Sequence, residues 1–327
     1  MWVQVLESVK SARVLITGGA GFIGSHLADE LMLRRSKVTV LDNLSNGSIK
    51  NIEKWLENPN FTFMRRDLLD AHSLEMALEG SEIVFHLAAN AEVRTGTTQP
   101  KIHYKQNIQT TFNLLEAMRK AGDIEVVVFT SSSTVYGEPT RMPTPENYAP
   151  LRPISVYGSS KLSCEALITG YANTYGFKAI IYRLANVIGP RSTHGVVYDF
   201  VQKLERDCTQ LEVLGDGTQK KSYLFIDDCI TAIDAGLKNT EDRVEIFNIG
   251  SDDQIDVKTI ANAVIEEMGL ENVTLRFAED VDGGRGWVGD VKSMLLDISR
   301  LRSKDWRPRY NSEQSVRLTV REILRGL

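Results

Sequence analysis

The sequence predicts an α/β protein with a Rossmann-type doubly wound parallel sheet and a smaller, partly interleaved α/β C-terminal lobe. Three observations predict this class. Strongly apolar strands alternate with amphipathic helices, a glycine-rich turn joins the first strand to the first helix, and the alternation loosens after residue 183. Strands that are apolar throughout are typical of parallel sheets with helices on both faces. We expect the sheet domain at residues 1–182, with returning segments at about 222–250, and most of the smaller lobe at residues 183–327.

The first elements form a βαβ unit. Arg13–Thr17 is a short apolar strand that leads into the turn Gly18–Gly24. The spacing of apolar side chains predicts a helix at 25–35, and Lys37–Leu41 is a second buried strand. The alternation then continues along the chain. Further strands are expected at 61–64, 83–87, 125–129 and 178–182. Helices are expected between them, at 73–78, 107–121 and 157–175.

Later elements are less regular. Ser73 is expected to cap the short helix that it begins, because serine is a preferred N-cap residue. Segments 222–237 and 247–250 are expected to return to the main sheet. The remaining expected elements are short strands at 212–214 and 273–277, and helices at 257–268 and near the C-terminus.

Composition bounds the function class. The 327 residues carry a formal net charge of −5, which argues against a nucleic-acid partner because such proteins usually present a basic face. Cys164, Cys208 and Cys229 are widely spaced, and the histidines show no metal-binding spacing, so we expect reduced thiols and no metal. Residues 1–11 contain no signal-peptide core, and the chain has no run of about 18 apolar residues. We therefore expect a soluble cytoplasmic protein with no membrane partner.

The glycine turn predicts a dinucleotide site. Gly18, Gly21 and Gly24 lie between a buried strand and a helix, where backbone N–H groups and the helix N-terminus can approach a pyrophosphate. Asp42 ends the second strand, at the position of an acid that binds the adenosine ribose. A carboxylate there would repel a 2′-phosphate, so NAD is favoured over NADP. Asp67 is placed to reach the adenine or, alternatively, to cap a helix.

A second set of residues predicts acid–base chemistry. Tyr157 and Lys161 are four residues apart in a predicted helix, so both point from one face. A nearby ammonium would lower the pKa of the phenol from about 10, which makes Tyr157 a candidate base for a substrate hydroxyl. Ser132 follows a buried strand at the edge where open α/β sheets bind ligands, and its hydroxyl could carry a proton.

These motifs resemble a known family in their order and spacing. They are TGGAGFIGSHL at Thr17–Leu27, LDNLSNG at Leu41–Gly47, HLAA at His86–Ala89, SSSTVYGE at Ser131–Glu138 and YGSSK at Tyr157–Lys161. Together they resemble the extended short-chain dehydrogenases/reductases, and more narrowly the NAD-dependent UDP-glucose 4-epimerases of archaeal and bacterial type. The resemblance extends from about Arg13 to near the end of the chain.

The resemblance implies a tightly bound NAD that is reduced and reoxidised within one turnover. Tyr157 would remove the O4 proton of the sugar while C4 gives hydride to the nicotinamide. Lys161 would hold the nicotinamide ribose and tune Tyr157, and Ser132 would assist proton transfer. The matching positions imply NAD contacts at Gly18, Gly21, Phe22, Ile23, Asp42, Asn43, Ser45, Asn46, Gly47, Asp67, Leu68, Leu87, Ala88, Ala89, Asn107, Tyr157 and Lys161.

One position separates the chemistries of this family. Sugar 4,6-dehydratases carry an Asp-Glu pair just before the Val-Tyr-Gly of this strand end, and nucleotide-glucuronate decarboxylases carry a Glu at the second position. Here the two residues are Ser133 and Thr134. A hydroxyl cannot act as an equivalent acid near neutral pH, so the sequence favours simple epimerisation at C4.

The resemblance also implies contacts with the nucleotide sugar. Asn186 is a candidate phosphate or sugar contact, or else a turn residue at a strand end. Lys221 stands where relatives often have arginine, and Arg285 is displaced from the usual spacing of a diphosphate ligand, so either could instead be a solvated surface cation. The uracil pocket would be lined by Val197 and Leu214. The full set of expected substrate contacts is Ser132, Thr134, Tyr157, Asn186, Val197, Leu214, Lys221 and Arg285.

Several readings stay open at this point. The first is a UDP-glucose 4-epimerase that interconverts UDP-glucose and UDP-galactose. Its rivals are a 4-epimerase of UDP-glucuronate, a UDP-N-acetylhexosamine or a GDP-sugar, and a net nucleotide-sugar dehydrogenase or reductase. A non-catalytic NAD-binding protein on the same fold is a reading of another class. By family analogy, helices 107–121 and 157–175 would pair across a two-fold axis in a homodimer.

Overall fold

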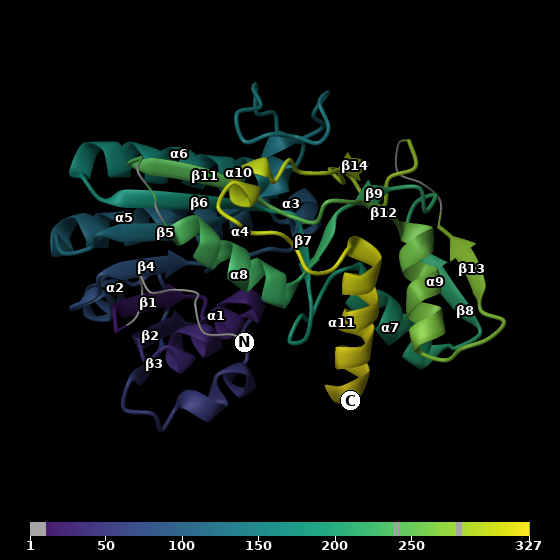
Figure 1. Ribbon diagram of the computed structural model, residues 1–327, viewed down its shortest axis with the longest axis horizontal. Helices are drawn as coiled ribbons and strands as arrows, with labels where there is room; N and C mark the ends of the chain where they lie inside the picture. The colour runs from purple at the N-terminus through teal and green to yellow at the C-terminus, as the bar shows by residue number, and fades with distance from the viewer. Residues whose placement is uncertain (1–10, 239, 241, 279–282, 327) are drawn as a thin grey trace. The chain divides into compact units, whose positions relative to one another are not determined.

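The computed structural model describes residues 11–238, 240, 242–278 and 283–326 (Figure 1). Within this part of the chain, two compact units alternate along the sequence. Unit 1 runs to residue 132 and includes 156–183 and 230–247, and unit 2 comprises 133–155, 184–229 and 248 onward. The interleaved α/β class expected from the sequence is confirmed. The assignment of NAD to one part of the chain and the nucleotide sugar to the other stays a prediction.

Unit 1 is built on a seven-stranded sheet with the order β11-β6-β5-β4-β1-β2-β3. Its strands are β1 (Arg13–Thr17), β2 (Lys37–Asp42), β3 (Phe61–Arg65), β4 (Ile83–His86), β5 (Val126–Ser132), β6 (Lys178–Leu184) and β11 (Val244–Ile249). The chain runs outward from β1 to β3 and then restarts on the other side of β1 at β4, and both neighbours of β1 are parallel to it. Open α/β sheets bind ligands where the strand order reverses in this way, at the carboxyl ends of the strands.

Helices cover both faces of this sheet. One face packs against α2 (Ala71–Leu78), α5 (Thr110–Ala121) and α6 (Val156–Tyr175), whose apolar side chains form a single core with residues of the strands. The other face carries α1 (Phe22–Leu33) and α8 (Ile226–Leu237). The Tyr182 hydroxyl of β6 donates to the carbonyl oxygen of Ile233 in α8, at 2.6 Å. Both faces of the sheet are therefore buried, as the apolar strands predicted.

Three helices begin two or three residues away from the position that the sequence predicted. The first helix begins at Phe22, because the last residues of the glycine turn, from 22 to 24, already form its first helical turn. The prediction that Ser73 caps the next helix is wrong: α2 begins at Ala71, and Asp70 accepts the His72 N–H and the Ser73 hydroxyl. The Asp70 carboxylate, three residues before Ser73, therefore caps the free N–H groups of the first turn in place of the Ser73 hydroxyl. The third helix, α5, begins at Thr110 because residues 104–109 form a π-helical turn.

The prediction that segment 222–237 returns to the main sheet is confirmed only in part: α8 lies against the sheet, but the strand before it does not join the sheet. That strand, β10 (Tyr223–Phe225), pairs in parallel with β7 (Asn186–Ile188) in a separate two-stranded sheet. The chain then enters α8, whose first turn carries Asp227 and Asp228, and acidic residues are favoured at a helix N-terminus. The other returning segment is confirmed, because β11 forms the edge of the main sheet beside β6.

Unit 2 has small sheets around a helical core. Its helices α7 (Val196–Arg206), α9 (Val257–Glu267) and α11 (Ser312–Gly326) pack with β8 (Gln210–Val213) and β13 (Thr274–Phe277), which are parallel. A three-stranded sheet contains β12 (Ile255–Asp256), β9 (Lys220–Lys221) and β14 (Ser293–Met294). The remaining short helical segments of the described chain are Ile49–Asn51, Glu53–Trp55, Ser133–Tyr136, α3 (Thr95–Thr98), α4 (Pro100–His103) and α10 (Ser299–Arg302).

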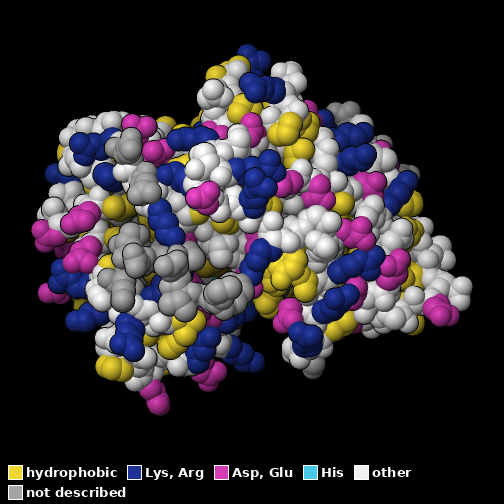
Figure 2. Space-filling model, in the orientation of Figure 1, with side chains coloured by type: hydrophobic (Ala, Val, Ile, Leu, Met, Phe, Trp, Pro, Cys, Tyr) yellow, Lys and Arg dark blue, Asp and Glu magenta, His cyan; other side chains and the backbone are white. Residues whose placement is uncertain are grey.

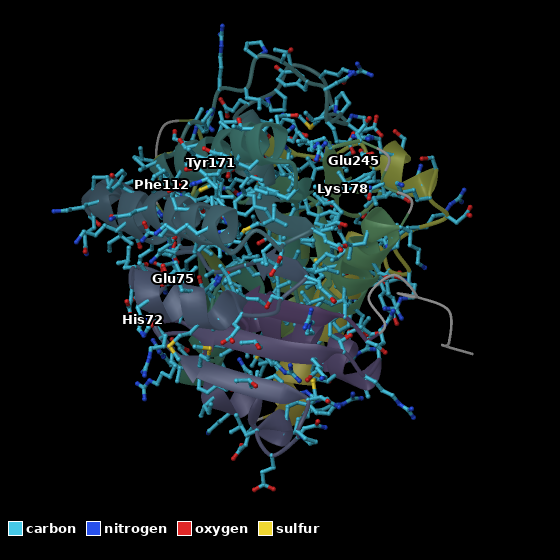
Figure 3. All side chains as sticks on the ribbon, turned by 90° about the vertical axis from the view of Figure 1, so that its left-hand side faces the viewer. His72, Glu75, Phe112, Tyr171, Lys178 and Glu245 are labelled. Carbon is cyan, nitrogen blue, oxygen red and sulfur yellow. The ribbon has the colours of Figure 1, made fainter. Side chains whose placement is uncertain are left out.

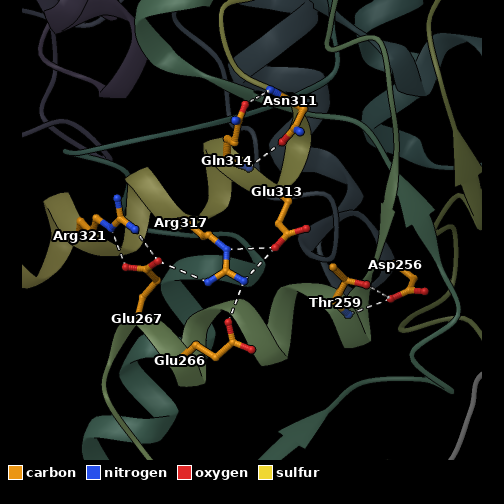
Figure 4. Close-up of polar contacts among 9 residues, drawn as sticks. All are labelled: Asp256, Thr259, Glu266, Glu267, Asn311, Glu313, Gln314, Arg317 and Arg321. Carbon is orange, nitrogen blue, oxygen red and sulfur yellow. Dashed lines mark hydrogen bonds and ion pairs between the residues drawn. The ribbon is translucent and has the colours of Figure 1, made fainter.

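A cluster of ion pairs joins α9 to α11 (Figure 4). The Arg317 guanidinium lies 2.7 Å from Glu266, 2.8 Å from Glu313 and 3.4 Å from Glu267. Arg321 also pairs with Glu267, at 2.6 Å. The three carboxylates raise the pKa of Arg317 above its ordinary value. An isolated surface pair contributes only ~0.2–1 kcal/mol, so the joining of several charges in one network is what makes this cluster relevant to stability.

Charges of both signs are interspersed over the surface (Figure 2). Lysine and arginine side chains lie beside aspartate and glutamate side chains on the parts of both units that this view shows. Among the described residues, no helix is both long and apolar enough to cross a lipid bilayer.

Candidate active site

The turn between β1 and α1 depends on two glycines. Gly18 has φ +71°, and a Cβ there would lie 2.7 Å from the amide nitrogen of Ala88. A Cβ on Gly24 would overlap the carbonyl oxygen of Gly18. Gly21 is the N-cap of α1 and offers no side chain to the first helical N–H groups. The turn therefore leaves room and backbone donors for an anion, as a pyrophosphate site requires.

Asp42 lies beside this turn, at the end of β2. One of its carboxylate oxygens accepts the Ala20 N–H at 3.0 Å, and the other accepts the Leu44 N–H at 2.8 Å. Burial raises the pKa of Asp42, and the two backbone hydrogen bonds oppose that shift. Each carboxylate oxygen has a second lone pair. The carboxylate is thus held in place by two hydrogen bonds, and its remaining lone pairs can accept hydrogen bonds from the hydroxyl groups of a ribose.

The other residues expected to contact NAD lie around this edge of unit 1. Asn43 donates to Asp67 at 2.9 Å, so the two expected contacts are linked to each other. A Cβ on Gly47 would lie 2.9 Å from the carbonyl carbon of Ala20, which makes this a second close approach of backbone. Phe22 and Ile23 open α1, Ser45 and Asn46 are exposed after β2, Leu68 is buried after β3, and Leu87, Ala88 and Ala89 follow β4.

Asn107 lies within the π-helical turn before α5. It is buried, accepts the Asn90 N–H at 2.8 Å and donates to the Ser160 hydroxyl at 2.8 Å. The Ser160 hydroxyl in turn donates to the carbonyl oxygen of Tyr157, at 2.7 Å. The extra residue of a π turn often marks a functional site. Here the turn connects the segment after β4 to the start of α6.

Ser132, Tyr157 and Lys161 come together in unit 1. The Ser132 hydroxyl is hydrogen-bonded to the Tyr157 phenol. The Lys161 ammonium donates to the carbonyl oxygen of Thr130 at 2.9 Å and lies 6.0 Å from the centre of the Tyr157 ring. The three expected catalytic residues therefore meet at the carboxyl end of β5, although Ser132 and Tyr157 are far apart in the sequence.

Burial dominates the electrostatics of this group. It raises the pKa of Tyr157 to about 12, and the hydrogen bond from Ser132 opposes that rise. The expectation of a lowered pKa is therefore not met in the protein itself. Burial also lowers the pKa of Lys161 to about 8, with Cys164 and Glu165 opposing. The ammonium is thus retained at neutral pH, but close to its point of titration.

His86 is a buried residue of this edge to which the sequence gave no role. Its Nδ1 lies 2.8 Å from the Thr17 hydroxyl and its Nε2 lies 2.9 Å from the Thr111 hydroxyl. Because the Thr111 hydroxyl donates to the carbonyl oxygen of Asn107 at 2.7 Å, Nε2 carries the proton and Nδ1 accepts from Thr17. The neutral ring ties β4 to β1 and α5. The HLAA motif was the signal that could have revealed it.

In unit 2, the two cations expected at the diphosphate are paired with carboxylates. Lys221 is half-buried, lies 2.5 Å from Asp290 and lies 5.2 Å from the centre of the Trp287 ring. Arg285 lies 2.5 Å from Glu138 and donates to the carbonyl oxygen of Asp290 at 2.8 Å. The alternative that either residue is a solvated surface cation is therefore wrong, because both form ion pairs. The sequence did not predict Asp290 or Glu138 as their partners.

The remaining expected substrate contacts of unit 2 lie in different surroundings. Asn186 donates to the carbonyl oxygen of Ser222 at 3.3 Å. Val197 is only 2% exposed and belongs to the apolar core of unit 2, whereas Leu214 is partly exposed after β8. Thr134 is partly exposed in a short helical turn after β5. Their contacts with a nucleotide sugar stay predictions.

Comparison with known proteins identifies the family. Residues 14–250 match the model of the NAD-dependent epimerase/dehydratase family. The chain belongs to this family. A UDP-glucose 4-epimerase of Mycolicibacterium smegmatis is 31% identical over 94% of this chain and 97% of its own length. The resemblance to extended short-chain dehydrogenases/reductases is thereby confirmed.

Solved structures give the same result for this epimerase/dehydratase-family enzyme. The crystal structure of a UDP-galactose 4-epimerase has a TM-score of 0.85 and 40% identity, covering 96% of this chain and 99% of that one. A UDP-glucuronic acid 4-epimerase from Bacillus cereus, solved with UDP-glucuronic acid and NAD, has a TM-score of 0.86 and 28% identity, covering 96% and 100%. NAD is therefore the cofactor, and the glycine turn, Asp42 and the backbone cradles fit it.

The neutral His86 predicts a dependence of stability on pH. Burial, together with the charge of Lys161, lowers its pKa from 6.5 to about 3. Its contribution is fully present above pH 6.5 and is lost as the pH falls towards 3, because the unfolded chain then binds the proton. The free energy of unfolding should fall by up to about 1.4 kcal/mol per pH unit in this window.

Chemical denaturation between pH 6.5 and 5 measures this effect before most carboxylates titrate. His86→Gln should show a shallower loss of stability with falling pH than the unsubstituted protein. The control, His72→Gln, changes an exposed histidine of α2 and should keep the original slope. Equal slopes for all three proteins would contradict the assignment of a neutral His86.

Proposed function

We propose that this protein is a UDP-glucose 4-epimerase that interconverts UDP-glucose and UDP-galactose by transient oxidation at C4, with tightly bound NAD. The observation that carries the proposal is the meeting of Ser132, Tyr157 and Lys161 at the carboxyl end of β5. A phenol that shares a hydrogen bond with a hydroxyl and lies near an ammonium is an arrangement for moving a proton. On this proposal the enzyme acts in galactose metabolism.

The three residues divide the work of proton transfer. Tyr157 takes the proton from O4 of the sugar and returns it, and the Ser132 hydroxyl holds the phenol and the sugar oxygen in line. With a pKa of about 12, Tyr157 is a poor base at neutral pH without further positive charge. The Lys161 ammonium supplies part of that charge. When bound, NAD supplies a hydride acceptor and donor and a positively charged nicotinamide ring.

The residues that follow β5 support epimerisation over elimination. Ser133 and Thr134 form the first half of a short helical turn in unit 2, and both are partly exposed. Loss of the C6 hydroxyl as water needs an acid, and hydroxyl side chains do not supply one near neutral pH. The proposal therefore assigns the enzyme to the epimerases of its family.

We also propose that Lys221 and Arg285 hold the diphosphate of the substrate. Asp290 organises both of them, because it pairs with the Lys221 ammonium through its side chain and accepts from Arg285 through its backbone. Glu138 fixes the guanidinium from a second direction. Asn186, Val197, Leu214 and Thr134 complete the proposed contacts with the nucleotide sugar.

Product analysis without added cofactor tests the proposed function. Purified protein is incubated separately with UDP-galactose, UDP-N-acetylgalactosamine and UDP-galacturonate, and products are resolved by proton NMR. UDP-glucose should form from UDP-galactose with no NAD supplied. If only one of the other two sugars is converted, the enzyme is a 4-epimerase of that sugar and not of UDP-glucose. Turnover only with stoichiometric NAD, with NADH accumulating, would show a net dehydrogenase and contradict the proposal.

A substitution of the proposed base completes this test. Tyr157→Phe should lower kcat by roughly 10²–10⁴-fold, the usual contribution of a general base. The matched control is Tyr104→Phe, which removes the hydroxyl of a tyrosine that is 56% exposed before α5 and should leave kcat unchanged. Full activity in Tyr157→Phe would contradict the assignment.

We further propose that the enzyme is a cytoplasmic homodimer formed through α5 and α6. Phe112 and Tyr171 lie on the face of these helices that Figure 3 shows, and the Tyr175 ring contacts that of Tyr171. Phe112 is 44% exposed and Tyr175 is 50% exposed, and their rings lie 6.3 and 5.2 Å from that of Tyr171. Gathered aromatic surface is typical of interfaces. Unpaired cysteines at 164, 208 and 229 suit a reducing compartment.

Charge placed on this aromatic face should separate the dimer. Phe112→Glu should sediment as a monomer in analytical ultracentrifugation, because an unpaired carboxylate would be buried in the interface. Phe277→Glu in unit 2 is the matched control, since Phe277 is 43% exposed and lies on another element, and this variant should remain a dimer. A dimer in both variants, or a monomeric unsubstituted protein, would contradict the proposed interface.

A further inference from the structure

A fully buried ion pair lies beneath the proposed catalytic group in unit 1. Arg183 of β6 and Glu165 of α6 have side chains that are only 3% and 5% exposed. The guanidinium donates to Oε2 of Glu165 at 2.7 Å and, through Nε, to Oε1 at 3.0 Å. The Ser131 hydroxyl of β5 donates to the same Oε1, at 2.5 Å. Two strands and a helix are thus joined at one carboxylate.

Stability alone does not explain such a pair. Removing two charges from water is costly, and replacing a buried ion pair by apolar side chains of similar volume is often neutral or stabilising. In some proteins buried ionic groups fix one arrangement over its alternatives. The question is therefore which arrangement this pair fixes.

The answer lies in the order of the side chains along α6. Tyr157, Lys161 and Glu165 are spaced by four residues, so they lie on one face of the helix at successive turns. Each one engages the end of β5: Lys161 bonds Thr130, Glu165 bonds Ser131, and Tyr157 bonds Ser132. Three neighbouring strand residues therefore contact three successive turns of the helix, although the order along the strand differs from that along the helix. At Glu165 a second strand, β6, joins the contact through Arg183.

We propose that Glu165 and Arg183 are positioning residues that hold α6 in register with β5, so that Tyr157 stays in line with Ser132. This inference rests on the proposed function for its effect on turnover. Neither residue touches the reacting atoms: their role is exerted through the helix and through Ser131. A small shift of the helix would lengthen the Ser132–Tyr157 hydrogen bond, and displacements of about 1 Å at a reacting group can reduce a rate by as much as 10²-fold.

The test uses the NAD-bound enzyme with both charges removed together. Glu165→Met/Arg183→Met leaves no unpaired buried charge and should remain folded with its NAD. Its kcat on UDP-galactose should fall roughly 10- to 100-fold, with KM changed by no more than about twofold. The control, Asp228→Asn/Arg309→Met, removes a pair in unit 2 in which Asp228 is fully buried. It should lower the melting temperature and leave kcat unchanged.

A titration of Tyr157 gives a readout that needs no turnover. The groups that face the phenol are Lys161 and Cys164 from α6, His103 from α4 and Ser132 from β5. Of these, the Ser132 hydrogen bond lowers the pKa of Tyr157. Losing the register should therefore raise that pKa. Tyrosinate absorbance, corrected with the Tyr157→Phe enzyme, measures the shift in the double variant and in Glu165→Gln, which keeps an acceptor for Ser131.

The outcomes separate this inference from the proposed function. An unsubstituted enzyme that converts no sugar would contradict the proposed function, while an upward shift of the Tyr157 titration would still support positioning. A folded double variant with unchanged kcat, or an unchanged Tyr157 titration in both variants, would overturn the inference. An equal fall of kcat in the Asp228/Arg309 control would also overturn it, because the effect would then follow from stability alone.

Discussion

The contact between one face of α6 and the carboxyl end of β5 is the interaction on which the site depends. Lys161, Glu165 and Tyr157 reach three consecutive residues of the strand, and each contact is made in a buried environment. A parallel sheet covered on both faces leaves its strand ends as the place where polar groups can gather. The fold thus delivers a lysine, a tyrosine and a serine to one edge, and the Glu165–Arg183 pair keeps that edge in register.

Burial at this edge has a chemical consequence as well as a structural one. It raises the pKa of Tyr157 and lowers that of Lys161, and it keeps His86 neutral beside them. A phenol that resists ionisation at rest is protected from acting as a base until positive charge arrives beside it. On the proposed function, the oxidised nicotinamide would bring such a charge, so the same burial that disfavours the phenolate would make its formation sensitive to NAD. In unit 2, Lys221 and Arg285 form ion pairs with Asp290 and Glu138.

Local patterns were sufficient for much of this architecture. Apolar runs predicted the strands of unit 1, and the glycine turn and Asp42 predicted a dinucleotide site that the family match supports. Features that depend on competition or on distant partners were not predictable. Asp70 outcompetes Ser73 as a cap, and the π-helical turn delays the start of α5. The Lys221–Asp290 and Glu165–Arg183 pairs join residues far apart in the sequence, and no local spacing indicates them.

Isotope tracing tests the central claim most directly, namely that hydrogen leaves C4 and returns to it within one enzyme-bound cycle. UDP-galactose deuterated at C4 is converted without added NAD, and the product is examined by proton and deuterium NMR. The account predicts UDP-glucose that retains deuterium at C4, because the label never exchanges with water. Loss of the label to solvent would contradict it by showing proton abstraction from carbon. Deuterium recovered in free NADH would contradict it by showing a net dehydrogenase.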